Sequence, residues 1–268
     1  MAKEQCQMGG SIKVSNSYGE IKKVIAVMSG KGGVGKSSVA GLIASSLQKK
    51  GKKVGVLDAD ITGPSIPKLF GINKKVIVRE DALIPAETAN GIKIISINLL
   101  LEKEDDPIIW RGPMISNVVK QFFEEVNWGN LDYLILDLPP GTGDVSLTVM
   151  QSLPLDGLIV VTSPQEMVGM IVKKAIHMAE NMGIEIYGIV ENMSYIDCPD
   201  CAKKIELFGC SNTDKIAKEV GLPMLGKLPL IPEVGKLCDQ GEIEMVGELY
   251  PDFFSQVTNE FLKRVKEE

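Results

Sequence analysis

Apolar stretches of strand length alternate with stretches in helical spacing along most of the chain. The expected strands are residues 23–29, 53–60, 91–97, 132–141 (a strand that runs into a sharp turn), 156–164, 185–193 and 223–230. The expected helices are residues 36–51, 114–126, 169–183 and 252–266. This alternation predicts an α/β fold, in which a mostly parallel sheet carries helices on both faces. We expect one domain over residues 21–268, after a flexible N-terminal segment, residues 1–20.

Composition and charge narrow the class of protein. The chain has 268 residues, 44% of them hydrophobic and only 5% aromatic, which suits a core of small aliphatic side chains. Its net charge of −6 disfavours nucleic-acid binding, which usually requires a basic face. No apolar run is long enough to span a membrane, and the polar N-terminus does not resemble a secretory signal. We therefore expect a cytoplasmic protein that binds neither nucleic acid nor a membrane.

The stretch 30–37, "GKGGVGKS", matches the phosphate-loop pattern G-x-x-x-x-G-K-[ST] between an expected strand and an expected helix. Glycines let backbone N–H groups approach phosphate oxygens closely, and the helix N-terminus adds positive partial charge. Lys36 is expected to contact the β- and γ-phosphates, and Ser37 to ligate Mg²⁺. Lys31 is a second lysine that a phosphate loop does not need. The expected nucleotide contacts here are Gly30, Lys31, Gly32, Gly33, Val34, Gly35, Lys36, Ser37 and Ser38.

Three aspartates follow apolar runs, at the ends of two expected strands. In open parallel sheets, ligands bind at the carboxyl ends of the strands. Asp137 fits the Walker B position, Asp58 could support Mg²⁺ directly or through water, and Asp60 could orient the attacking water. Gly141, in the turn after the Asp137 strand, could sense the γ-phosphate through its backbone N–H.

Cys198 and Cys201 form "CPDC", a spacing that lets both sulfurs reach one metal. Two thiolates are half of a tetrahedral or cubane site, and a two-fold dimer would supply the other half. The motif lies in an expected loop, residues 194–212, after a late strand, which disfavours a thioredoxin-like redox pair. A zinc knuckle completed by Cys210 or Cys238 stays open.

The early lysine and four further stretches resemble one family. "KGGVGKS" resembles the deviant Walker A ATPases, which include the nitrogenase iron protein, MinD and ParA. "DADITGPSIPKLFG" (58–71), "WRGPM" (110–114), "DYLILDLPPGTGDVSLTVMQ" (132–151) and "NMSYIDCPDCAKKIELFG" (192–209) are similar to the Mrp/ApbC-type iron–sulfur carriers. The resemblance covers roughly residues 20–265.

The resemblance implies a homodimer that closes around ATP, with Lys31 of one copy touching the nucleotide of the other. It implies adenine contacts from Asn192, Pro229 and Leu230. It also implies a [4Fe–4S] cluster bridging the Cys198 and Cys201 pairs of two copies. Zinc could take the place of a labile cluster, since thiolates accept both. The expected partners are apo iron–sulfur proteins and a scaffold or cluster donor.

Two other functions are weighed against a cluster carrier. A MinD- or ParA-like spatial-organisation ATPase would need a membrane-seeking tail helix or a basic face. The tail, residues 253–268, has an apolar stripe but ends in acids, so we expect it to pack on the sheet. An electron donor like the nitrogenase iron protein is disfavoured by how close the two cysteines are in sequence.

Overall fold

The computed structural model describes residues 15–60, 63, 65–73, 76–79, 82–100, 112–165, 168–201 and 203–265. Cys6, most of the segment 1–20 and part of the "WRGPM" stretch lie outside these residues. Near the start of the described residues, Asn16 donates side-chain hydrogen bonds to the carbonyls of Phe123 (2.8 Å) and Val126 (2.9 Å).

The central sheet has eight strands in the order β12-β9-β8-β1-β7-β2-β6-β5. Their bounds are β1 Ile21–Ser29, β2 Val54–Asp58, β5 Ala86–Glu87, β6 Lys93–Ser96, β7 Leu131–Asp137, β8 Gly157–Thr162, β9 Ile186–Glu191 and β12 Met224–Lys227. All neighbouring pairs are parallel except β5 with β6. The expected mostly parallel sheet is therefore confirmed, and β1, which leads into the phosphate loop, is one of its central strands.

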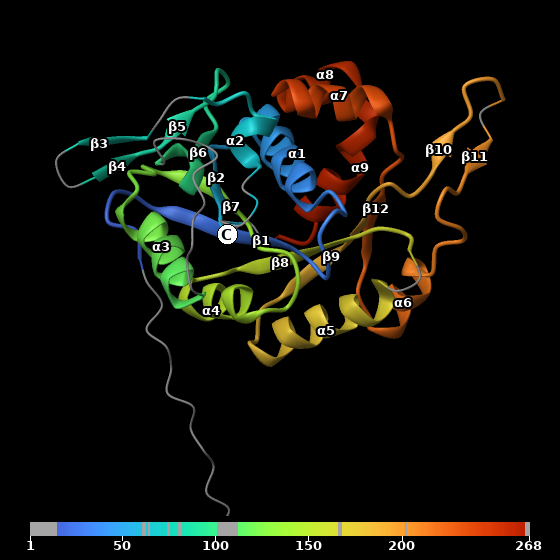
Figure 1. The fold of residues 1–268 in the computed structure, drawn as a ribbon, viewed down its shortest axis with the longest axis horizontal. Coiled ribbons are helices and arrows are strands. Elements are labelled where there is room, and N and C mark those ends of the chain that lie inside the picture. Colours follow the sequence, from blue (N-terminus) through green and yellow to red (C-terminus); the bar gives the residue numbers. More distant parts are fainter. Residues whose placement is uncertain are drawn as a thin grey trace, which may run out of the picture.

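Helices cover both faces of this sheet (Figure 1). On one face lie α1 (Lys36–Lys49), α2 (Ile66–Leu69), α7 (Pro232–Gln240), α8 (Val246–Leu249) and α9 (Pro251–Leu262). On the other lie α3 (Gly112–Glu125), α4 (Asp144–Ser152), α5 (Val168–Asn181) and α6 (Thr213–Glu219).

The two faces have separate hydrophobic cores because side chains alternate along each strand. In β1, Ile25 and Val27 join the core under α1 and α9, whereas Val24, Ala26 and Met28 join the core under α3, α4 and α5. Strands buried on both faces read as continuous apolar runs, which is why the sequence pattern found them.

The C-terminal helix α9 packs on the sheet, as expected of the apolar tail. Phe254, Val257 and Phe261 are buried in the core. The Phe261 ring lies 5.7 Å from the ring of Tyr187 and 6.2 Å from the ring of Tyr133, between centroids. No described helix is long and apolar enough to cross a membrane.

Several short elements lie outside the predicted set. They are the hairpin of β3 (Ile77–Arg79) and β4 (Ala82–Ile84), the edge strand β5, the 3-10 turns Ile97–Leu99 and Ile243–Met245, and the helices α2, α6, α7 and α8. Elements this short span too few residues for a clear hydrophobic period. The expected strand 223–230 is also shorter than predicted, because only Met224–Lys227 pairs with β9.

The stretch 194–212, expected to be a loop, contains a small antiparallel pair of strands. β10 (Ile196–Asp197) pairs with β11 (Lys204–Ile205), and the pair stands away from the central sheet beyond β12 (Figure 1). We call residues 194–211 the cysteine hairpin.

Candidate functional site

The phosphate loop joins the end of β1 to the start of α1. Gly33 and Gly35 have φ angles of +78° and +77°, a left-handed conformation that glycine adopts without strain. Gly35 is the residue that precedes the first turn of α1. The Ser29 hydroxyl donates to the carbonyl of Lys31 at 2.8 Å, which fixes the first residues of the loop.

Lys36 and Ser37 meet the strand-end acids. Lys36 Nζ lies 2.6 Å from Asp137 Oδ1 and 3.8 Å from Asp60 Oδ2. The Ser37 hydroxyl donates to the other Asp137 oxygen, Oδ2, at 2.5 Å. Lys36 and Asp137 are only 6% and 0% exposed, so this ion pair is shielded from water. The structure thus brings together the lysine, the hydroxyl and two carboxylates that were predicted to handle phosphate and Mg²⁺.

Strand order explains this meeting. β7 lies between β1 and β2, and Asp137 is in register with Val27 on one side and Asp58 on the other. The carboxyl ends of these parallel strands therefore share one edge with the phosphate loop, as expected for this kind of sheet.

Asp58 organises the segment that follows β2. Its Oδ1 accepts the N–H of Asp60 at 3.1 Å, while Oδ2 accepts the N–H of Ile66 at 3.3 Å and the hydroxyl of Ser96 at 3.2 Å. The Asp58 side chain is fully buried. These contacts hold the backbone of Asp60 in place beside Lys36.

Burial is the largest influence on the pKa values of Asp58 and Asp137. Loss of water raises the pKa of Asp58 well above its usual value, and the nearby Asp137 charge raises it further, against the lowering effect of Lys36. Burial also raises the pKa of Asp137, again opposed by Lys36. One lysine therefore faces three buried acids, an arrangement in which an added cation would be stabilised.

Lys31 and Gly141 are both engaged within the chain. Lys31 Nζ donates to Oε1 of Gln165, which lies shortly after the end of β8. The N–H of Gly141 donates to the carbonyl of Ser29 at 2.8 Å. To reach a nucleotide, the single N–H of Gly141 must leave the Ser29 carbonyl.

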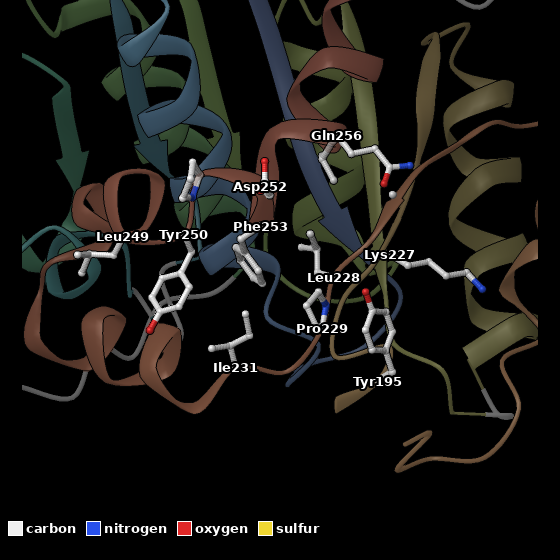
Figure 2. A pocket seen from close by; sticks show the side chains of 13 residues that line it. Tyr195, Lys227, Leu228, Pro229, Ile231, Leu249, Tyr250, Asp252, Phe253 and Gln256 are labelled. Atoms are coloured by element: carbon white, nitrogen blue, oxygen red, sulfur yellow. The ribbon is translucent and has the colours of Figure 1, made fainter. Parts of the chain in front are cut away.

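Of the expected adenine contacts, Asn192 touches the phosphate loop directly. Its Nδ2 donates to the carbonyl of Val34 at 3.0 Å. Pro229 lines a cavity of about 460 Å³, together with the Tyr195, Tyr250 and Phe253 rings (Figure 2). Leu230 is not among the residues that line this cavity, and its N–H donates to the carbonyl of Tyr195 at 2.7 Å. None of the cavity's lining residues belongs to the phosphate loop.

Cys198 and Cys201 lie at the turn of the cysteine hairpin, where Cys201 is exposed and Cys198 half-buried. Hydrogen bonds from the backbone N–H groups of Asp200 and Cys201, and from the Cys201 side chain, lower the pKa of the Cys198 thiol. A lowered thiol pKa favours the thiolate, which is the form that binds metals. A turn between two strands also differs from the helix start that a thioredoxin-like pair would occupy.

The other described cysteines do not complete this pair within one chain. Cys238 is buried in the core on α7, and burial raises the pKa of its thiol. The neighbouring Glu206 raises the pKa of the exposed Cys210 thiol. Within the described ranges, no group of three or more His, Cys, Asp or Glu residues is placed to hold a metal.

Sequence reasoning missed several polar residues of the site. Ser96 and Gln165 partner Asp58 and Lys31, and nothing in the local pattern marks them. Glu191 ends the apolar run of β9 and is fully buried. That is the same signal, an acid at the end of a buried strand, that marked Asp58 and Asp137.

Comparisons with known proteins agree with this geometry. The family described as NUBPL iron-transfer P-loop NTPase matches residues 20–265. An iron-sulfur cluster carrier protein of Clostridium perfringens is 50% identical over 247 residues, covering 89% of this chain and 87% of that protein. One of Methanocaldococcus jannaschii is 48% identical, covering 85% of this chain and 80% of that protein.

Solved structures show the same fold. A nucleotide-binding protein of Archaeoglobus fulgidus in complex with ADP, with cobalt found, has a TM-score of 0.77 and 44% identity, covering 88% of this chain and 91% of that one. MinD of Aquifex aeolicus, in complex with MinC, has a TM-score of 0.66 at 19% identity, covering 92% and 97% of the two chains, which shows the fold alone. The expected family is confirmed: this chain belongs to the iron-transfer P-loop NTPases, the group in which the iron-sulfur cluster carriers fall.

Proposed function

We propose that this protein is an ATP-binding, slowly ATP-hydrolysing carrier that holds a labile [4Fe–4S] cluster between two copies of the chain and passes it to apo-proteins. The observation that carries the proposal is the pair Cys198 and Cys201, presented at the turn of a projecting hairpin with no third metal ligand grouped with it among the described residues. The phosphate loop and the acids around it supply the nucleotide half of the proposal.

The proposed binding of ATP and Mg²⁺ is supported by the contacts of Lys36 and Ser37 with Asp137. Lys36 would turn from Asp137 to the β- and γ-phosphates, while Ser37 and Asp137 would hold Mg²⁺. The present contacts support this exchange, because Ser37 and Lys36 already meet at one carboxylate. Mg²⁺ would supply charge neutralisation at the phosphates, and Asp58 would keep the Asp60 segment in place.

Hydrolysis needs a water and a second source of positive charge. Asp60 would orient the water that forms the new bond to the γ-phosphorus as the bond to the β–γ bridging oxygen breaks. Lys31 would leave Gln165 and contact the nucleotide of the second copy, stabilising charge as an arginine finger does. Gly141 would report the γ-phosphate by exchanging its Ser29 partner for a phosphate oxygen. Asn192 and Pro229, and less directly Leu230, would face the adenine.

The cluster half needs a second copy. Each chain supplies two thiolates, and a two-fold axis near the hairpin turn supplies the same two again. Zinc could occupy the same thiolates in preparations that lack a cluster. A scaffold or cluster donor would load the dimer, and residues 21–268 would act as one domain within it.

Anaerobic reconstitution with iron and sulfide tests this function. We expect visible absorption, bound iron and sulfide, and the native mass of a dimer for the parent protein. Cys198→Ala should lose the cluster, whereas Cys210→Ala, a matched change at an exposed thiol on the same hairpin, should load normally.

Two results would count against the proposal. If Cys198→Ala binds as much cluster as the parent, the bridging arrangement is wrong. If Cys210→Ala also loses its metal, Cys210 completes a zinc knuckle within one chain instead.

A further inference from the structure

A buried carboxylate lies where the cysteine hairpin leaves the sheet. Glu191, the last residue of β9, is fully buried. It accepts a hydrogen bond from the Ser194 hydroxyl at 2.5 Å on Oε1 and another from the Ser211 hydroxyl on Oε2. Lys227 Nζ on β12 lies 3.8 Å from Oε1. A carboxylate is buried at high free-energy cost unless donors compensate it, and here three groups do so.

The two serines are the two ends of the cysteine hairpin. Ser194 precedes β10, Ser211 follows β11, and Cys198 and Cys201 lie between them. A backbone hydrogen bond also holds the first end of the hairpin, since the N–H of Ser194 donates to the Leu228 carbonyl at 2.8 Å. The Ser211 hydroxyl also accepts the N–H of Thr213, the first residue of α6, at 3.1 Å. One carboxylate therefore ties both ends of the hairpin to the sheet.

Asn192, the residue after Glu191, contacts the phosphate loop. Asn192 donates to the Val34 carbonyl at 3.0 Å, and its Nδ2 lies 2.2 Å from where a Cβ on Gly35 would be. Met193, between Asn192 and Ser194, has a φ of +55° and is the one described non-glycine residue with a positive φ. Such a conformation is costly for a side chain other than glycine and persists only where surrounding contacts impose it.

We propose that Glu191 is a positioning residue that couples the phosphate loop to the cysteine hairpin. A shift of Val34 and Gly35 on nucleotide binding would move Asn192, and the constrained turn at Met193 would pass the movement to the Glu191–Ser194–Ser211 contacts. The hairpin would then turn as a unit about its two attachments. What the hairpin carries rests on the proposed function, but the coupling itself does not.

Thiol reactivity in cluster-free protein tests the coupling without any metal. Cys198 and Cys201 are alkylated with and without a non-hydrolysable ATP analogue and Mg²⁺, and each site is followed by peptide mass spectrometry. In the parent we expect the nucleotide to change the alkylation rate by about fivefold, the lower end of ordinary coupling between two sites. Ser211→Ala should still bind the nucleotide, measured by calorimetry, yet lose this response.

Three further variants sharpen the result. Ser211→Thr keeps the hydroxyl and should restore the response, whereas Ser255→Ala, the same truncation at an exposed serine of α9, should leave it intact. Glu191→Gln should lose the response. If Glu191→Gln does not fold, Ser211→Ala alone tests the coupling.

The coupling is overturned if the parent shows no nucleotide response, or if Ser211→Ala keeps the full response. Failure of the cluster function has a different signature. Cys198→Ala would then bind as much cluster as the parent, whatever the thiol rates show.

Discussion

At the scale of single residues, the two lysines of the phosphate loop have different surroundings. Lys36 is nearly buried and paired with a fully buried carboxylate, whereas Lys31 donates to Gln165 in an exposed contact. The loop pattern predicts that Lys36 touches phosphate, and the family resemblance implies that Lys31 touches the nucleotide of a second copy. Neither predicts that Lys36 alone is buried in an ion pair with a strand-end acid.

Replacing each lysine with alanine should separate these roles. Without nucleotide, Lys36→Ala leaves Asp137 buried without its partner and should lower the free energy of unfolding by about 3 kcal/mol. Lys31→Ala should change it by less than about 0.5 kcal/mol, as is usual for exposed sites. Urea unfolding measures both values.

The same two variants should also differ in activity. Both should lose ATP turnover, but Lys31→Ala should retain more nucleotide binding. Unchanged turnover in Lys31→Ala would rule out a role for Lys31 across a dimer.

Asp58 should make the stability of the empty protein depend on pH. Its folded-state pKa is raised above the unfolded value of about 3.8, so the folded chain holds the proton more tightly than the unfolded chain does. Its contribution to stability is therefore present at low pH and is lost as the pH rises through the raised pKa. The stability of Asp58→Asn relative to the parent should rise with pH from about pH 4 upward, until the raised pKa of Asp58 is passed.

Asp132→Asn is the control for this pH effect. The hydrogen bond from Lys22 lowers the pKa of Asp132, so its contribution is lost only as the pH falls. The difference between Asp132→Asn and the parent should stay flat above about pH 5. A flat difference for Asp58→Asn as well, in urea unfolding across the same range, would contradict the raised pKa.

At the scale of elements, the glycines of the phosphate loop are not equivalent. Gly35 has a left-handed φ, and a Cβ there would lie 2.2 Å from the Asn192 side chain. Gly32 has no atom within 4 Å of the same position and no left-handed φ. The shared glycine pattern does not distinguish the two, because the difference comes from Asn192, more than a hundred residues away.

Alanine at each glycine should show this difference without any nucleotide. Gly35→Ala should lower the free energy of unfolding by at least about 1 kcal/mol from the left-handed backbone alone, plus the displacement of Asn192. Gly32→Ala should stay within about 0.5 kcal/mol of the parent. Equal losses in thermal or urea unfolding would contradict both the left-handed backbone at Gly35 and its close contact with Asn192.

The tail helix α9 belongs to the core, which bears on the MinD-like alternative. Phe261→Ala should lower the free energy of unfolding by about 3–5 kcal/mol, because the ring is fully buried against Tyr133 and Tyr187. Phe253→Ala, at a half-buried ring of the same helix, should cost less. Pelleting of the protein with liposomes in the presence of ATP would instead support a membrane-seeking tail.

At the scale of the whole molecule, the cysteine pair makes assembly depend on cargo. If four thiolates from two chains hold one cluster, loading should convert the 29.1 kDa chain into a species of twice that mass. Removing the iron with a chelator, in the absence of nucleotide, should return the protein to the mass of one chain. Light scattering that shows one copy per loaded cluster would contradict the shared site.

The main strands, the phosphate loop, the candidate acids and the cysteine pair could be predicted from the sequence alone. Strands buried on both faces gave continuous apolar runs, and the phosphate loop, Asp58, Asp137 and the Cys198–Cys201 pair could be read from spacing and strand ends. The family followed from the same stretches. These features are local, since each depends on residues within one strand, turn or loop.

The tertiary structure decided which of these groups meet. Lys36 pairs with Asp137, a hundred residues away, because the strand order places β7 between β1 and β2. Gln165 holds Lys31, and Glu191 ties both ends of the cysteine hairpin, for reasons that no local pattern records. A hydrogen bond forms only between groups that the folded backbone brings within about 3 Å, and strand order and packing, not sequence spacing, set that distance.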